Sequence, residues 1–114
     1  MRLVVKLSSM LGLWYWFKRK STSSFKPVIL VTGGASGIGL AIAELLTRQK
    51  DYRVVVTARE HSIKKLTQIF QESEKLWLRP LDVTQNDQRV RLISEINQKW
   101  GGVNVLINCA GISY

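Results

Sequence analysis

Residues 32–39 read TGGASGIG, and this stretch decides the fold expected of the 114-residue chain. An apolar run, Val28–Val31, comes directly before it, and a run with helical spacing, Leu40–Arg48, comes directly after it. A buried strand, a glycine turn and a helix N-terminus in this order suit a phosphate group. Glycine lets the backbone approach the ligand closely, and the first N–H groups of the helix are unpaired. The stretch therefore predicts a phosphate-bearing ligand at the start of this helix.

Two further short motifs follow, each at the end of a predicted strand. One glycine motif alone is weak evidence, whereas three landmarks in order are strong evidence. The three are Gly33, Gly37 and Gly39 in the spacing T-G-x-x-x-G-x-G, then Leu81-Asp82-Val83, then Asn108-Cys109-Ala110-Gly111. This set resembles the short-chain dehydrogenase/reductase family over Lys26 to Tyr114. Cys109 stands where the family's N-N-A-G motif has its second asparagine.

Strand and helix signals alternate along the chain after residue 26. The predicted strands are Pro27–Thr32, Arg53–Thr57, Leu76–Leu81 and Val103–Ile107. The predicted helices are Gly37–Arg48, Ser62–Gln71 and one from Thr84 to a stop at Gly101-Gly102. Such alternation implies parallel strands joined by right-handed crossovers. We therefore expect an α/β fold with a Rossmann-type parallel sheet, β-α-β-α-β-α-β in strand order 3-2-1-4, incomplete at the C-terminus. Its fourth strand would be an exposed apolar edge.

Each predicted helix carries apolar residues at helical spacing, which should pack on the sheet. The sets are Ile38, Ile42, Leu45 and Leu46 in the first helix, Ile63, Leu66 and Phe70 in the second, and Val90, Ile93, Ile96 and Trp100 in the third. Thr84 is the predicted N-cap of the third helix, with Asp87 three residues later.

Charge and composition narrow the class of protein. The net charge is +9, but residues 1–26 carry six Lys/Arg and no acid, while residues 27–114 carry eleven Lys/Arg against eight Asp/Glu. The excess therefore belongs mostly to the N-terminal segment, and no nucleic-acid-binding motif accompanies it. Cys109 is the only cysteine, so no internal disulfide can form. The single histidine, His61, has no clustered partners and is expected at the surface, and no metal-ligand spacing occurs.

Residues 1–25 form a separate basic and aromatic leader. The apolar run Met10–Phe17 precedes Lys18-Arg19-Lys20, a pattern typical of a membrane-interface segment. A disordered leader and a cleaved signal peptide are the alternatives. Ser21–Ser24 reads as a flexible linker before the partial NAD(P)-binding domain at residues 26–114. We therefore expect a cytoplasmic protein that associates with membranes through its N-terminal segment.

The resemblance implies a cofactor site at the carboxyl ends of the predicted strands. Gly33, Ser36, Gly37, Ile38 and Gly39 would lie against the cofactor phosphates. Asp82 would bond the adenine amino group, with Val83 against the ring, and Asn108, Ala110 and Gly111 would line the cofactor. Asp82 could instead be an ordinary turn residue, and Asn108 could hold neighbouring strands together. Cys109 is interpreted as a small buried residue rather than a nucleophile.

The end of the second predicted strand indicates which cofactor is used. An NAD site places a carboxylate there for the ribose hydroxyls, and the matching residue is Ala58. Arg59 follows, and its guanidinium suits a 2′-phosphate, so NADP is favoured over NAD. A register shift would instead bring Glu60 to the ribose.

The family's chemistry uses a tyrosine and a lysine four residues later, whose charge lowers the tyrosine pKa for proton transfer to or from a carbonyl or alcohol. This chain has no such pair: Tyr15 is followed four residues on by Arg19, Tyr52 by Val56, and Tyr114 is the last residue. We therefore expect the cofactor-binding portion of an NADP-preferring oxidoreductase. A non-catalytic dinucleotide-binding or membrane-tethered module and a non-functional truncated remnant are the alternatives. The substrate and the oligomeric state stay open.

Overall fold

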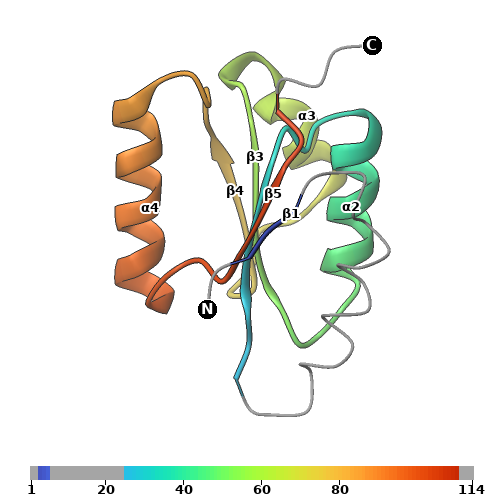
Figure 1. Cartoon of the computed structure of the whole chain (residues 1–114). Coiled ribbons are helices and arrows are strands. Elements are labelled where there is room, and N and C mark those ends of the chain that lie inside the picture. The colour runs from blue at the N-terminus through green and yellow to red at the C-terminus, as the bar shows by residue number, and fades with distance from the viewer. Residues whose placement is uncertain (1–2, 6–24, 111–114) are drawn as a thin grey trace.

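The computed structural model describes residues 3–5 and 25–110, and it contains one parallel five-stranded sheet (Figure 1). The strand order is β1-β5-β2-β3-β4, and every pairing is parallel. The strands are β1 (Leu3–Val5), β2 (Val28–Thr32), β3 (Arg53–Ala58), β4 (Leu76–Pro80) and β5 (Val105–Asn108). The helices are α2 (Gly37–Thr47), the 3-10 turn η2 (Glu60–Ser62), α3 (Ile63–Ile69) and α4 (Asn86–Trp100).

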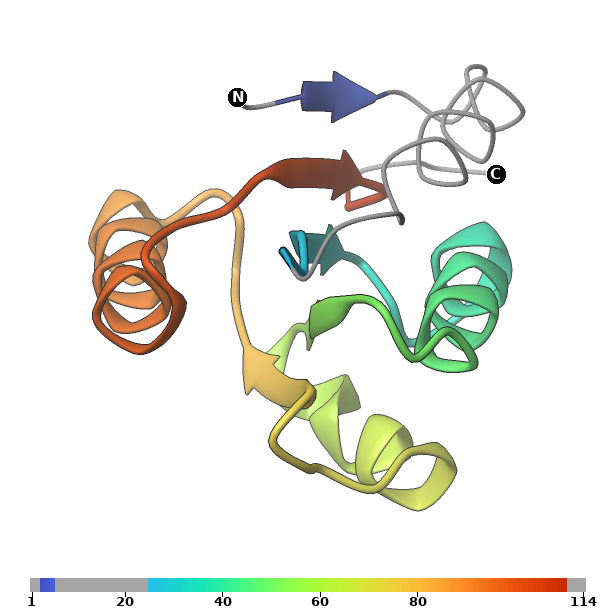
Figure 2. The same cartoon turned by 90° about the horizontal axis from the view of Figure 1, so that it is seen from below.

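The predicted fold class is confirmed, because β4, β3, β2 and β5 lie in the expected order 3-2-1-4. Helices cover both faces of the sheet: α2 and α3 lie on one face and α4 on the other (Figure 2). All five residues of β2 are buried, as are five of the six in β3. A strand covered on both faces needs apolar side chains on both, which explains the continuous valine and isoleucine runs in these two strands.

The strand β1 is the main difference from the sequence expectation. Leu3–Val5 pairs with β5 in the register Leu3↔Val105, Val4↔Leu106 and Val5↔Ile107. The edge of β5, expected to be exposed, is therefore covered by Leu3–Val5, which belongs to the predicted leader. The predicted membrane-interface segment at Met10–Phe17 lies outside the described residues. Within residues 3–5 and 25–110, no helix is long and apolar enough to cross a membrane.

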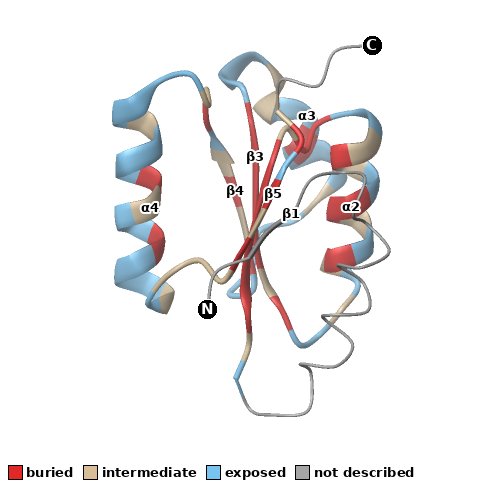
Figure 3. Cartoon of the chain, in the orientation of Figure 1, coloured by how far each residue is buried: buried red, intermediate tan, exposed pale blue. Residues whose placement is uncertain are grey.

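The helix faces are only partly as predicted. On α2, Ile42 and Leu46 are buried, but Leu45 is 38% exposed and Ala43 takes its place in the core. On α4, Ile96 is buried, but Val90 is 59% exposed and Leu92 is buried instead. The buried residues of α2 and α4 lie on the side of each helix that faces the sheet, and the rest of each helix is intermediate or exposed (Figure 3).

The predicted start of α4 is also wrong. The N-cap residue is Gln85 rather than Thr84, and the helix begins at Asn86. The Thr84 backbone N–H and side-chain hydroxyl instead donate to Asp82 Oδ1, over 3.0 and 2.7 Å. Because Thr84 is held in this local turn with Asp82, it does not occupy the N-cap position of α4. At the other end, Gly101 closes the helix in a left-handed conformation with φ +85°, as expected.

The packing of α4 gives a direct test of the fold. Ile96 is fully buried between α4 and the sheet, so Ile96→Ala should lower the free energy of unfolding by about 2–5 kcal/mol through lost burial and a residual cavity. Val90 lies on the same helix but is largely exposed, so Val90→Ala should change it by less than about 0.5 kcal/mol. Denaturant unfolding followed by circular dichroism measures both. Equal losses of unfolding free energy in the two variants would contradict the burial of Ile96 and the exposure of Val90 on this helix.

Candidate cofactor site

The turn between β2 and α2 is set by very close backbone packing. A Cβ atom on Gly39 would lie 2.1 Å from the Gly33 carbonyl oxygen, a distance that no side chain tolerates. Gly39 therefore lets the first turn of α2 sit directly on the end of β2. Gly37 plays a different part: its φ is +57°, and a Cβ atom there would meet nothing within 4 Å. The left-handed backbone at Gly37 thus borders open space rather than packed protein.

The first turn of α2 keeps its N–H groups free of the usual side-chain cap. Ser36 is the N-cap residue, a position where serine normally accepts a hydrogen bond from the second or third helical N–H. Its side chain makes no such bond. The N-terminus of this eleven-residue helix therefore presents unpaired donors and the positive end of the helix dipole, which together attract an anionic group.

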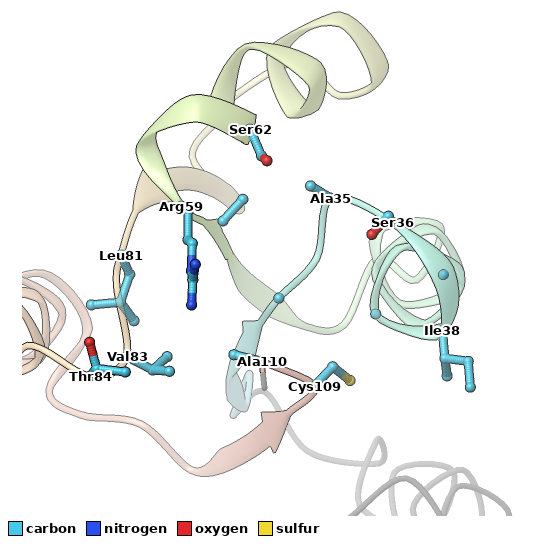
Figure 4. A pocket seen from close by; sticks show the side chains of 14 residues that line it. Ala35, Ser36, Ile38, Arg59, Ser62, Leu81, Val83, Thr84, Cys109 and Ala110 are labelled. Carbon is cyan, nitrogen blue, oxygen red and sulfur yellow. The ribbon is translucent and has the colours of Figure 1, made fainter. Parts of the chain in front are cut away.

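A cavity of about 450 Å³ opens at this helix terminus, at the carboxyl ends of the strands. This volume falls within the range of small-molecule sites, which is about 300–1,000 Å³. Figure 4 shows its lining side chains drawn from the glycine turn, the end of β3 and the segments after β4 and β5. The lining residues are Gly33, Ala35, Ser36, Gly37, Ile38, Gly39, Ala58, Arg59, Ser62, Leu81, Val83, Thr84, Cys109 and Ala110.

Most of the predicted site residues meet in this cavity. Those that line it are Gly33, Ser36, Gly37, Ile38, Gly39, Arg59, Val83 and Ala110. Residues distant in sequence converge here because parallel strands end at one edge of the sheet. Three predicted residues are not among the lining: Asp82 borders a neighbouring cavity, Asn108 borders a groove beside α4, and Gly111 lies outside the described residues.

Asp82 serves a local turn. Its Oδ1 atom accepts both hydrogen bonds from Thr84, and these bonds are the main reason that the pKa of the Asp82 carboxyl is below its usual value. The positive charge of Arg59 lowers this pKa further, by a smaller amount. The geometry thus matches the alternative of an acidic turn residue.

Asn108 links two strands, as the structural alternative proposed. The Thr32 hydroxyl donates to Asn108 Oδ1 over 2.6 Å, at the position where the register pairs these two residues. The backbone N–H of Cys109 continues the contact by donating to the Thr32 carbonyl over 3.1 Å. These bonds fix the carboxyl ends of β2 and β5 side by side, directly beneath the cavity.

Several lining residues were not predicted as site residues. Ala35, Ala58 and Leu81 contribute apolar wall. Cys109 is buried, as interpreted from the sequence, and burial raises the pKa of its thiol, so the reactive thiolate is disfavoured. Ser62 and Thr84 add hydroxyl groups. No local pattern marked Ser62, because it joins the lining through the 3-10 turn Glu60–Ser62.

These features first define a class of protein: a parallel α/β domain in which a glycine-rich turn and a helix N-terminus without a side-chain cap border a cavity suited to an anionic group. The family follows from comparison. The family model for short chain dehydrogenase matches residues 27–114. The chain therefore belongs to the short-chain dehydrogenase/reductase family, as the sequence motifs indicated.

Three similar proteins illustrate the family. Carbonyl reductase [NADPH] 1 of Rattus norvegicus is 40% identical over 95 residues, which cover 81% of this chain and 34% of the relative. NAD-dependent glycerol dehydrogenase of Listeria innocua is 33% identical over 86 residues, covering 75% of this chain and 33% of the relative. The solved structure of NADPH-bound carbonyl reductase from chicken fatty liver superposes with a TM-score of 0.67 at 25% identity, covering 84% of this chain and 38% of that one. The chain spans about a third of the length of these curated relatives.

The Thr32–Asn108 bond can be tested by a double-mutant cycle. Thr32→Val removes the hydroxyl at nearly constant volume, and Asn108→Ala removes its acceptor. We expect the two changes in unfolding free energy to be non-additive by about 0.5–1.5 kcal/mol, the net value of one hydrogen bond. Denaturant unfolding of the wild type, both single variants and the double variant measures this coupling. Additive effects would show that the bond does not hold β2 to β5.

Proposed function

We propose that the chain is the cofactor-binding portion of an NADP(H)-dependent oxidoreductase acting on a carbonyl or alcohol. The choice of NADP(H) rests on the lining of the cavity at the end of β3, where Ala58 offers no carboxylate and Arg59 follows it. An acid here would repel a 2′-phosphate, whereas a guanidinium binds one through paired hydrogen bonds. NAD is the less favoured cofactor, and the relatives' names include both kinds.

The side chains around the turn support this choice. Glu60, the residue that a register shift would bring to the ribose, borders the neighbouring cavity with His61 and Asp82 and does not line the cofactor cavity. The observed register pairs Ala58 with Pro80 at the end of β3. Arg59 borders both cavities, and it is the one charged residue among the described residues that line the cofactor cavity.

The residues of this chain would bind and orient the cofactor. The N–H groups at the start of α2 and the glycine turn would hold the diphosphate, and the apolar side chains of Leu81 and Val83 would lie against the adenine. NADP(H), when bound, supplies or accepts a hydride. The tyrosine and lysine that would handle the accompanying proton do not occur at the required spacing in this sequence. The proposed activity therefore belongs to a complete protein that contains this domain.

A second candidate is a binding module without catalysis of its own, favoured by the missing Tyr-x-x-x-Lys spacing. Both candidates require NADP(H) binding, and they differ in turnover. A remnant that neither folds nor binds is the third outcome. A cytoplasmic location stays a prediction. Association of the N-terminal segment with membranes is a second prediction, which liposome partitioning of the full chain would test.

Thermal unfolding of the full chain with NADPH and with NADH tests the proposal. A ligand that binds only the folded state at about a hundred times its Kd stabilises it by about 2.7 kcal/mol. NADPH should raise the midpoint more than NADH at equal concentration. No cooperative transition, or no shift with either ligand, would contradict the proposal.

Replacing Arg59 tests the choice of cofactor. Arg59→Asp should weaken NADPH binding by roughly ten- to a hundredfold and reverse the preference, because the carboxylate repels the 2′-phosphate and accepts the ribose hydroxyls. Arg48→Asp makes the same charge change at an exposed position just beyond the C-terminal end of α2, so it should leave the NADPH/NADH ratio unchanged. Isothermal titration of each variant gives the two affinities. An unaltered ratio in Arg59→Asp would remove this residue from the role.

A further inference from the structure

The two outermost strands of the sheet, β1 and β4, protect its edges in different ways (Figure 2). On β4, the Leu76 N–H donates to the Ser73 carbonyl over 3.4 Å, and the Ser73 N–H donates back to the Leu76 carbonyl over 3.0 Å. The Leu78 N–H donates to Glu72 Oε1 over 2.8 Å, and Pro80 has no N–H. These alternate residues direct their backbone groups to one side of the strand. The outer side of β4 is therefore closed to a further strand by its own neighbours.

The opposite side of the sheet relies on β1 alone among the described residues. β5 consists of Val105–Asn108, without a charged residue or a proline. Charged side chains, proline and bulges are the features with which proteins prevent strand addition at an exposed edge. None of them occurs in β5, and its outer side is covered only by the pairing of Leu3–Val5 with Val105–Ile107. The three residues of β1 thus take the place of built-in edge protection.

This cover is small compared with the rest of the sheet. β1 pairs with β5 at three positions, whereas β2 and β5 pair at four and are joined by the Thr32–Asn108 side-chain bond as well. Placing β1 also requires residues 6–27 to close a long loop back to β2, which costs conformational entropy. A short strand held at the end of a long loop is among the first elements to open locally.

A second copy of the chain is the occupant that suits the uncovered edge. Two β5 strands related by a two-fold axis would pair antiparallel, each offering the same row of backbone groups to the other. Because β5 carries no charge, no like charges would face each other across this contact. The β4 edge cannot form an equivalent contact, since its outward groups are already bonded.

We propose that the outer edge of β5 is a self-association surface and that Leu3–Val5 controls it by occupying this edge within a single chain. When β1 leaves, the β5 strands of two copies pair edge to edge. β1 and the second copy exclude each other, because both use the same outward backbone groups of Val105–Ile107. The N-terminal strand is therefore an internal competitor of the contact between copies. This inference is independent of the proposed cofactor.

The double variant Val4→Pro/Val5→Pro of the full chain tests the proposal. Proline removes the N–H of both residues, so whichever of the two faces β5 is lost. We expect self-association to become roughly tenfold tighter or more than in the wild type, measured by sedimentation velocity. Reducing conditions keep Cys109, the only cysteine, from linking copies covalently. Val4→Thr/Val5→Thr is the matched control: it keeps both N–H groups and a β-branched shape, and should associate like the wild type.

Hydrogen exchange measured by mass spectrometry locates the contact. In the double-proline variant, β5 should exchange faster than in the wild type at low protein concentration and become protected as the concentration rises. β2 should stay protected throughout, because it lies inside the sheet. An added peptide with the sequence of residues 1–7 should compete with the second copy and return the variant to the monomer. The same peptide carrying Val4→Pro and Val5→Pro should not.

Several results would overturn the proposal. They are unchanged association in the double-proline variant, an equal increase in the double-threonine control, and association without concentration-dependent protection of β5. Circular dichroism establishes whether each variant folds. If the double-proline variant does not fold, the single variants Val4→Pro and Val5→Pro replace it. Only one of them removes the N–H that faces β5, so only that one should associate more tightly, and equal association in both single variants and the wild type would refute the role of β1.

Discussion

The contact between Gly39 and the carbonyl of Gly33 is the constraint on which the site depends. A single methyl group at Gly39 would lie 2.1 Å from that oxygen, so the first turn of α2 can rest on β2 only when residue 39 has no side chain. This packing places the helix N-terminus at the carboxyl edge of the sheet. Because the α2 terminus lacks a side-chain cap, its N–H groups stay available to an anion. The cavity is therefore a direct consequence of how closely two backbone segments approach.

The second requirement is that the strand ends stay together. Thr32 and Asn108 join β2 to β5 by a 2.6 Å hydrogen bond, just before the chain reaches Cys109 and Ala110 in the cavity wall. The contact lies where the strand order reverses, the place at which open α/β sheets leave a crevice for ligands. The side-chain bond adds to the backbone pairing of these two strands, in which Thr32 stands opposite Asn108.

Two strands that would otherwise expose an edge have partners. On one side β1 pairs with β5. On the other side the Leu78 N–H of β4 donates to Glu72 Oε1 over 2.8 Å, and Arg79 bonds the same oxygen over 2.6 Å while its guanidinium lies 4.5 Å from the Trp77 ring centre. Unpaired strand edges promote association between chains, and a bound carboxylate blocks one of the donors that a foreign strand would use.

The sequence by itself determined the strand and helix order, the parallel sheet, the family and the glycine turn, because apolar periodicity and glycine spacing are local properties of the chain. It also indicated Arg59, which follows a strand whose end the valine run marks. Only the tertiary structure decided the rest. Whether Leu45 or Ala43 is buried depends on how α2 is rotated on a twisted sheet. The pairing of β1 joins Leu3–Val5 to a strand about a hundred residues away, and no local pattern specifies such a partner. Ser62 enters the cavity because a 3-10 turn folds it back towards Arg59, a geometry set by contacts that composition does not record.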